Sequence, residues 1–469
     1  MQIGKRDIMW SYLAQGLRWG QSLIVLPVVL RVIPAEQMAF WYLFATISSL
    51  VMLFDFGFSA TIVRNITYVF SGTKTLLKEG ISSDTEQGNE VDSNLLRTVI
   101  DSSKYIYKLL SAVIFIVLLV AGTYYVYEII QTKGVEEISM IWLAWGLTAI
   151  NTTTSFYYLY LNALLYGRGY IRHVQKATVV TNLLGLALTF TFLWLGFGIA
   201  AMAISAFITV IINRLLCRRY FYDAPLRQIL VHSIKPTKEH LRQTISIIWF
   251  NAKKTGVVAI GAFLITRVGQ FLVTSFFALS VAAQYGLTMQ VITMISGLAV
   301  TYISVMYPKI THDYFNGNIE AVRRHFSLMA VVIFLTFLIC GVGLVLFGEP
   351  LLVLIKSQTH LLPRWQVAAL LLVFFLESQH AAFSNIHQIQ NRIPFVKPAI
   401  ISGAAILIIT YLMLTFVGAN LWYVIGVQFV VQAAYNNWKW IYDTCKKLNT
   451  TYLEFYKLGF AELLKYVFK

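Results

Sequence analysis

The feature that most constrains this chain is a succession of apolar stretches, each roughly 18–25 residues long. Helices of this length cross a hydrocarbon core of about 30 Å with their backbone groups hydrogen-bonded internally. The first six stretches fall near residues 8–33, 38–63, 106–128, 139–163, 174–195 and 198–216, and the second six near 247–275, 283–307, 326–347, 366–388, 397–417 and 420–442. This pattern predicts an all-α polytopic membrane protein with about 12 transmembrane helices.

Composition excludes several other classes of protein. Hydrophobic residues make up 58% of the 469 residues and charged residues only 12%, whereas soluble domains contain roughly 45–50% apolar and about 25% charged residues. A disordered chain and a soluble enzyme are therefore excluded. A net charge of +16 would suggest a nucleic-acid partner for a polar chain, but in a chain this apolar it indicates membrane topology.

The distribution of basic residues predicts the orientation of the chain. With a cytoplasmic N-terminus, 31 of the 37 lysines and arginines fall in cytoplasmic segments and four in external loops. Loops rich in lysine and arginine stay on the cytoplasmic side of a membrane. We therefore expect both termini in the cytoplasm, and we interpret the apolar stretch after the first few residues as a membrane span rather than a cleaved signal peptide.

The two halves of the chain resemble each other. Residues 18–21 (Arg-Trp-Gly-Gln) match residues 267–270 (Arg-Val-Gly-Gln), and residues 47–50 (Ile-Ser-Ser-Leu) match residues 295–298 (Ile-Ser-Gly-Leu). The offset is 249 residues for the first pair and 248 for the second. With six spans in each half, the two copies have the same topology, which is typical of the parallel repeats in transporters that open alternately to the two sides of a membrane.

We expect four parts along the chain. They are an N-lobe with spans 1–6 over residues 1–216, a basic cytoplasmic linker over 217–246, a C-lobe with spans 7–12 over 247–442 and an amphipathic cytoplasmic tail over 443–469. The tail alternates apolar residues with lysines, which is typical of a helix at a membrane surface.

Two arginines fall deep inside the expected spans. Arg18 lies about ten residues into span 1, and Arg267 occupies the matched position of span 7. A charged side chain at this depth is costly to insert, and it usually faces a cavity or a partner. Because the two arginines recur with the repeat, we expect them to bind a ligand. The candidate substrate-binding residues are Arg18, Arg267, Gln15, Gln21 and Gln270.

Two acids also fall inside the expected spans. Asp55 lies in span 2 and Glu377 in span 10, where His380 follows at a spacing that can relay or sense protons. We treat these three residues as candidates for coupling or for lining a hydrated cavity between the two lobes. A second interpretation stays open, because polar side chains also pack membrane helices and Asp55 could pair with Arg18 or Arg64.

Motifs for catalysis, metal binding or nucleotide binding find no support. The three cysteines form no CxxC pair, and the eight histidines show no metal-ligand spacing. Gly343 and Gly348 have the spacing of a P-loop, but Glu349 occupies the position of its lysine. We therefore expect no enzymatic activity, no cofactor, no metal and no nucleic-acid partner.

A run in the second span resembles a known family. Residues 53–58 (Leu-Phe-Asp-Phe-Gly-Phe), followed by Arg64, resemble bacterial polysaccharide flippases of the MOP exporter superfamily, the O-antigen or Wzx-type translocases. The stretch 12–64 carries most of the likeness, and residues 166–169 (Tyr-Gly-Arg-Gly) resemble the connection between spans 4 and 5 in that family. The polar insertion around Asp84 departs from the family pattern.

The resemblance implies a MOP- or MATE-like carrier in the bacterial inner membrane. Such a carrier flips undecaprenyl-pyrophosphate-linked oligosaccharide, an O-antigen or capsule repeat unit, from the cytoplasmic to the periplasmic leaflet. The resemblance also implies a cationic central cavity, which Arg18 and Arg267 would supply, and coupling to H⁺ or Na⁺ as in some members of the family. A glycan polymerase and a chain-length regulator are the protein partners that it suggests.

Two other functions are compatible with many membrane spans. A membrane glycan polymerase or ligase needs substrate-holding residues on sizeable external loops, and the expected external loops are short. An ion-coupled multidrug exporter of the MATE type that expels cations should present acids to its ligand, whereas the deep charges here are two arginines and two acids.

Overall fold

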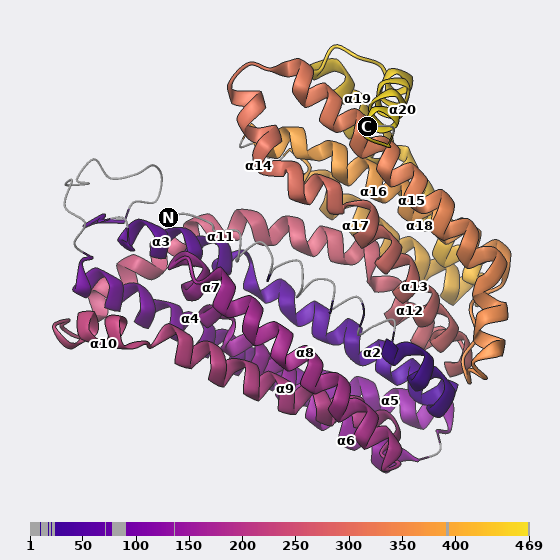
Figure 1. Ribbon diagram of the computed structural model, residues 1–469. Helices are drawn as coiled ribbons and strands as arrows, with labels where there is room; N and C mark the ends of the chain where they lie inside the picture. The colour runs from indigo at the N-terminus through magenta and orange to yellow at the C-terminus, as the bar shows by residue number, and fades with distance from the viewer. Residues whose placement is uncertain are drawn as a thin grey trace. The chain divides into compact units, whose positions relative to one another are not determined.

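The computed structural model of the chain consists of helices joined by short connections (Figure 1). It describes residues 24–70, 72–76, 91–135, 137–390 and 394–467, together with residues 10, 17 and 20. Helix accounts for 86% of the structure, and these ranges contain no strand. Nine helices in the same ranges are long and apolar enough to cross a membrane. The all-α polytopic fold predicted from the sequence is confirmed.

The chain divides into two compact units, Met1–Ala259 and Ile260–Lys469. The helices of unit 1, in chain order, are α2 (Ala35–Met52), α3 (Phe58–Phe70), α4 (Ser93–Val117), α5 (Thr123–Lys133), α6 (Ile138–Tyr157), α7 (Leu159–Gly167), α8 (Ile171–Trp194), α9 (Gly198–Phe221), α10 (Ala224–Val231) and most of α11 (Lys238–Thr266). A 3₁₀ turn (Leu53–Asp55) follows α2, and a π-helical turn (Leu118–Gly122) joins α4 to α5.

Aromatic side chains and small residues hold unit 1 together. The rings of Phe44 on α2 and Trp145 on α6 lie 5.3 Å apart, and α9 packs against both α6 and α8. A Cβ atom on Gly167 would lie 2.7 Å from the side chain of Ile66 and from the carbonyl oxygen of Val63. Glycine at position 167 therefore lets α7 approach α3 closely, as small residues do between membrane helices.

Unit 2 contains the remaining helices. After the end of α11 these are α12 (Val268–Phe276), α13 (Leu279–Ala299), α14 (Thr301–Phe315), α15 (Ile319–Leu354), α16 (Arg364–Ile389), α17 (Val396–Phe416), α18 (Leu421–Ala434), α19 (Asn436–Lys447) and α20 (Tyr452–Val467). The longest, α15, has 36 residues, which corresponds to about 54 Å and exceeds the thickness of a hydrocarbon core.

The last helix, α20, packs along α15 (Figure 1). Phe455 is fully buried in this contact region, and a Cβ atom on Gly459 would lie 2.2 Å from the carbonyl oxygen of Ser327. The amphipathic segment expected at the C-terminus thus uses its apolar face to cover another helix of unit 2.

Helices break at matched positions of the sequence repeat. In unit 1, α2 ends at Met52 and the chain turns through Phe56 and Gly57, whose φ angles are 45° and 80°, before α3 begins. In unit 2, α13 ends at Ala299 and α14 begins at Thr301. An offset of 248 residues places Met52 opposite Val300. The repeat therefore includes the position of a helix break.

The expected spans 2–12 each coincide with a helix or a broken helix in the described ranges. Half of the expected span 1 lies outside the described residues, and residues 24–32 of it are helical. The expected spans at 139–163 and 420–442 fall on the helix pairs α6–α7 and α18–α19, which are not among the nine long apolar helices. The count of about 12 spans and the cytoplasmic termini stay predictions.

Candidate functional site

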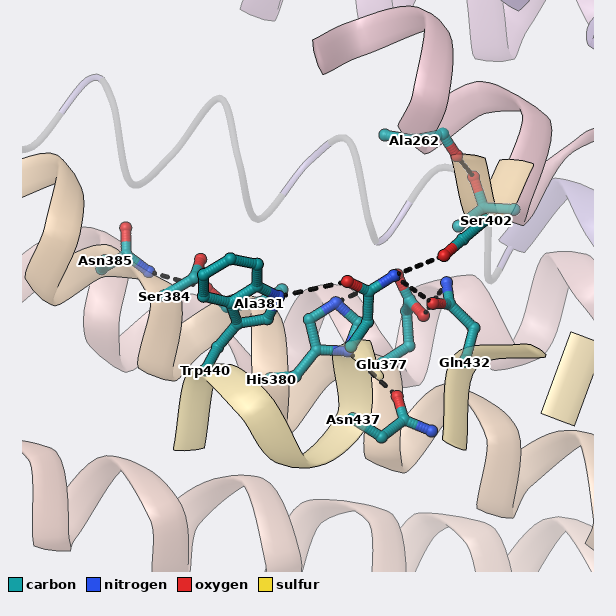
Figure 2. A network of polar contacts seen from close by, with 12 residues as sticks. Ala262, Glu377, His380, Ala381, Ser384, Asn385, Ser402, Gln432, Asn437 and Trp440 are labelled. Atoms are coloured by element: carbon teal, nitrogen blue, oxygen red, sulfur yellow. Dashed lines mark hydrogen bonds and ion pairs between the residues drawn. The ribbon is translucent and has the colours of Figure 1, made fainter. Parts of the chain in front are cut away.

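A buried polar network joins four helices of unit 2 around Glu377 (Figure 2). Its members, which we call the Glu377 cluster, are Glu377 and His380 on α16, Ser402 on α17, Gln432 on α18, and Asn436, Asn437 and Trp440 on α19. All of them are buried except Glu377, whose side chain is 17% exposed. A group of polar side chains buried among apolar helices must satisfy its hydrogen bonds internally.

A helix break positions two members of the cluster. Helix α18 ends at Ala434, and Tyr435 has φ −144° and ψ −61°, outside the helical region, before α19 begins at Asn436. Gln432 and Asn436 lie on opposite sides of this break, and the Asn436 amide nitrogen donates to Gln432 Oε1 at 2.7 Å. Interrupted helices at membrane depth are tolerated where neighbouring groups satisfy the polar atoms that the break releases.

The hydrogen bonds of the cluster form a chain in which each donor points from Trp440 toward Glu377. The indole nitrogen of Trp440 can only donate, and it donates to Asn436 Oδ1 at 3.3 Å. The Asn436 amide nitrogen donates to Gln432 and also to Ser402 Oγ at 2.9 Å. Gln432 Nε2 in turn donates to Glu377 Oε2 at 3.0 Å. Because the indole orients each amide that follows, one oxygen of Glu377 is held as a hydrogen-bond acceptor.

The other oxygen of Glu377 faces His380. The Nε2 atom of His380 lies 3.6 Å from Glu377 Oε1, and its Nδ1 donates to Asn437 Oδ1 at 3.1 Å. A neutral imidazole with its proton on Nδ1 presents a lone pair at Nε2. Two unprotonated atoms that face each other repel, so this arrangement is favourable when one proton lies on either Glu377 or His380. The Glu377 cluster can therefore hold one exchangeable proton.

Arg267 lies at a second helix break in unit 2. It is the single residue between α11 and α12, with φ −122°, and it is half-buried. In the described part of the chain its guanidinium forms no hydrogen bond and no ion pair. The arginine is close to the buried Tyr285, and a Cβ atom on Gly269 would lie 2.4 Å from the Tyr285 hydroxyl. The glycine of the repeated motif therefore allows α13 to pack close to this break.

Gln270 occupies a different environment from Arg267. Its side chain is buried, and Nε2 donates to Thr274 Oγ1 and to the carbonyl oxygen of Ala282, both at 3.3 Å. These bonds join α12 to the start of α13. A role of Gln270 in substrate binding stays a prediction, and its described contacts serve helix packing.

Asp55 forms a separate polar group in unit 1. One carboxylate oxygen accepts hydrogen bonds from Ser59 Oγ at 2.9 Å and from the Tyr107 hydroxyl, and the other oxygen accepts from the Ser59 amide at 3.4 Å. The carboxylate thus lies at the first turn of α3, where free backbone N–H groups favour a negative charge. Arg64, the partner considered from the sequence, is exposed and has no described bond to Asp55.

Four residues singled out from the sequence lie outside the described residues. They are Gln15, Arg18, Gln21 and Asp84. The structure therefore brings together Glu377 and His380, and it places Arg267 at a helix break of the same unit.

Sequence reasoning missed the amide partners of Glu377. A detectable signal was present, because Gln428, Gln432 and Asn436 recur every four residues in an otherwise apolar stretch and so share one helix face. It also did not single out Arg214, near the end of the expected span 198–216. In the structure Arg214 belongs to α9, and its guanidinium donates to Asn162 Oδ1 at 3.1 Å and to Ser155 Oγ at 3.3 Å.

No protein-family model matches the chain, and the search of curated proteins found no match. Solved structures do match. A MATE family multidrug resistance transporter of the MOP superfamily, in an inward-facing conformation, superposes with a TM-score of 0.63 and 16% identity, over 92% of this chain and 94% of that one. The lipid II flippase MurJ, in an inward closed conformation, gives a TM-score of 0.60 and 15% identity, over 97% and 91% of the two chains.

A third match is the MATE multidrug transporter DinF-BH in complex with R6G. Its TM-score is 0.57 at 14% identity, and the alignment covers 96% of this chain and 97% of that one. At identities this low the comparisons concern the fold. The protein has the helical fold that MATE transporters and the flippase MurJ share.

Proposed function

We propose that the protein is a membrane transporter that flips undecaprenyl-pyrophosphate-linked oligosaccharide across the bacterial inner membrane by alternating access. The substrate would be an O-antigen or capsule repeat unit. The fold shared with MATE transporters and MurJ supports transport, and the sequence repeat supports an alternating-access mechanism. The residues that resemble polysaccharide flippases support the choice of substrate.

Arg267 is the observation that carries this proposal. Its guanidinium is half-buried at a helix break and has no acidic partner among the described residues. A buried cation without a partner is costly, so its presence indicates an anionic ligand. Pyrophosphate is well suited to this role, because a guanidinium binds phosphate oxygens through two parallel hydrogen bonds. Arg18, at the matched position of the repeat, would supply a second such group.

The test uses Arg267→Gln with Arg214→Gln as the matched control. Purified protein in liposomes is given a fluorescently labelled lipid-pyrophosphate oligosaccharide, and a membrane-impermeant quencher reports its transfer between leaflets. Loss of two charge-assisted hydrogen bonds should slow transfer about tenfold or more. Arg267→Gln should leave the melting temperature unchanged, whereas Arg214→Gln should lower it because Asn162 and Ser155 lose their donor.

Full transfer by Arg267→Gln would contradict the assignment of the arginine. A wild-type protein that transfers no lipid-linked glycan would contradict the proposed substrate. Formation of a longer glycan in the same liposomes would instead support a polymerase.

The Glu377 cluster supports coupling to protons within this transporter. A carboxylate and an imidazole that share one proton can change protonation as access alternates between the two sides. Gln432 and Asn437 hold the two groups in place through the bonds described above. We propose that Glu377 and His380 carry the coupling proton, and that no other cofactor takes part.

An ion-coupled multidrug exporter is the second candidate. The acid of the Glu377 cluster, which is partly exposed, favours it, because a carboxylate attracts organic cations. The same liposomes test it with a fluorescent cation such as rhodamine 6G in place of the lipid. Uptake of the cation that requires Glu377, without transfer of the lipid, would select this function over the flippase.

A further inference from the structure

Unit 1 contains a basic cavity that the proposed transport function does not use. Its volume is about 800 Å³, and its charged lining comes from three helices: Lys104 on α4, Arg218 and Arg219 on α9, and Arg227 on α10. We call it the Arg218 cavity. It is built from residues of unit 1, whereas Arg267 and the Glu377 cluster belong to unit 2.

Tyrosines form the rest of the polar wall of the Arg218 cavity. The break between α6 and α7 at Tyr158 brings two of them together, and the rings of Tyr157 and Tyr158 lie 4.7 Å apart. Tyr222 lines the cavity just beyond the end of α9, and its buried hydroxyl has no hydrogen-bond partner in the described part of the chain. A buried hydroxyl without a partner is costly. When the Tyr222 ring turns toward the cavity that it lines, a group bound there can supply the missing bond.

The acids next to the cavity are paired with residues other than its three arginines, and Asp101 contacts Lys104 of the cavity wall. Asp101 lies 3.6 Å from Lys104 and 3.7 Å from Arg97. Asp223, next to Tyr222, accepts hydrogen bonds from Arg168 and Tyr170, both at 2.8 Å, and caps the first turn of α10.

The three arginines that line the cavity are exposed to solvent at its wall. Within the described ranges, no acid forms an ion pair with Arg218, Arg219 or Arg227. Exposed guanidinium groups that line one cavity repel one another weakly, and an anion bound between them removes this repulsion.

The wall that carries Arg227 is held in place by α4. Arg97 Nη1 donates to Ser233 Oγ at 3.2 Å, and the Ile234 amide donates to Asn94 Oδ1 at 2.8 Å. Figure 1 shows α10 beside α4 at one end of unit 1. Because both ends of the short helix are anchored, the backbone that carries Arg227 is held in place at the cavity wall. A preorganised set of donors loses little entropy when it binds a ligand.

We propose that the Arg218 cavity binds a phosphate group, carried either by an anionic membrane lipid or by a soluble phosphorylated compound. Guanidinium groups bind phosphate oxygens through paired charge-assisted hydrogen bonds, and the Tyr222 hydroxyl can donate one more. The volume is within the range of small-molecule sites, which is roughly 300–1,000 Å³. Basic pockets at the cytoplasmic ends of membrane helices bind lipid head groups in this way.

The experiment measures binding to the full chain purified in neutral detergent. Cardiolipin and phosphatidylcholine are titrated and retained lipid is counted by native mass spectrometry, while inorganic pyrophosphate is titrated by isothermal calorimetry. Cardiolipin should bind in preference to phosphatidylcholine if the source is a lipid, and pyrophosphate should bind with comparable affinity if the source is soluble. Absence of preferential cardiolipin binding together with absence of pyrophosphate binding would overturn the proposal.

A triple variant and its matched control locate the site. A triple variant, Arg218→Gln, Arg219→Gln and Arg227→Gln, should weaken binding about tenfold or more. Its control removes the same number of charges from exposed positions of the same segment, Lys235→Gln, Lys238→Gln and Arg242→Gln. Equal losses in the two triple variants would show binding by general surface charge and would overturn the proposal.

Tyr222→Phe provides a test that does not depend on how well the triple variant folds. It removes only a hydroxyl that has no partner in the described chain, so the melting temperature should stay the same or rise. Affinity for the phosphate-bearing probe should fall several-fold. Unchanged affinity would show that the hydroxyl does not face the ligand and would contradict the cavity as the binding site.

Discussion

Replacement of Glu377 by glutamine separates two properties of this side chain, its hydrogen bonding and its capacity to carry a proton. The glutamine carbonyl can accept the bond that Gln432 donates to Glu377 Oε2 at 3.0 Å. Its amide nitrogen then faces His380 Nε2, which lies 3.6 Å from the other carboxylate oxygen. Glutamine therefore reproduces the protonated acid and keeps the polar network intact.

The expected magnitudes differ for stability and for transport. Because each hydrogen bond is kept, Glu377→Gln should change the free energy of unfolding by less than about 1 kcal/mol, whereas Glu377→Leu leaves the Gln432 amide without an acceptor and should cost about 1–3 kcal/mol. One pH unit changes the free energy of one transferred proton by about 1.4 kcal/mol, which is about tenfold in equilibrium. Wild-type transport should respond to a one-unit gradient by up to this factor, and Glu377→Gln should not respond.

The assay is transfer of labelled lipid-linked glycan in liposomes with and without an imposed pH gradient. The matched control is Glu349→Gln, because Glu349 pairs with His360 at 2.5 Å in an exposed position. This control removes an acid from a Glu–His pair outside the cluster and should keep the wild-type pH response. A Glu377→Gln protein that transports and still responds to the gradient as the wild type does would refute the assignment of Glu377 as the proton carrier.

Two further predictions concern stability. Burial would raise the pKa of Asp223, but hydrogen bonds from Arg168, the Leu226 amide and Tyr170 hold it below its ordinary value of 3.8. The ionised carboxylate therefore stabilises the fold above about pH 4, and this stabilisation is lost as the pH falls through the lower pKa of the folded state. The difference in melting temperature between wild type and Asp223→Asn should shrink below pH 4. A difference that stays constant from pH 7 to pH 3 would contradict the assignment. Gly459→Ala should lower stability by about 1–3 kcal/mol and expose the C-terminal helix to protease, because its Cβ would lie 2.2 Å from a backbone oxygen of α15. Unchanged protection of α20 would show that the contact accommodates the added methyl group and would contradict this prediction.

The helical class and the positions of most spans could be predicted because they depend on local composition. An apolar stretch long enough to cross a bilayer must be helical to satisfy its own backbone, so the regions from 38–63 to 420–442 match helices or broken helices of the structure. The pairing of Glu377 with His380 was predictable for the same reason, since residues three apart on a helix are neighbours.

The partners of these residues could not be predicted from spacing along the chain. Gln432 lies 55 positions from Glu377, and Asn437 lies 57 positions from His380. Their contacts depend on how α16 packs against α18 and α19 and on the break at Tyr435. The Arg218 cavity could not be predicted for the same reason. Its arginines lie in a basic linker whose positive charge is already explained by membrane topology.

Local sequence was therefore sufficient for the hydrophobic length of the helices, the segments in which positive charge accumulates and the presence of charged residues in apolar spans. These properties belong to one segment at a time. Tertiary structure was needed to show which charges have partners. In the folded chain, Ser59 and Tyr107 hydrogen-bond to Asp55, and Gln432 donates a hydrogen bond to Glu377. Arg218, Arg219 and Arg227 line one cavity. The energy of a buried charge depends on its neighbours in space, and those neighbours come from helices far apart in the chain.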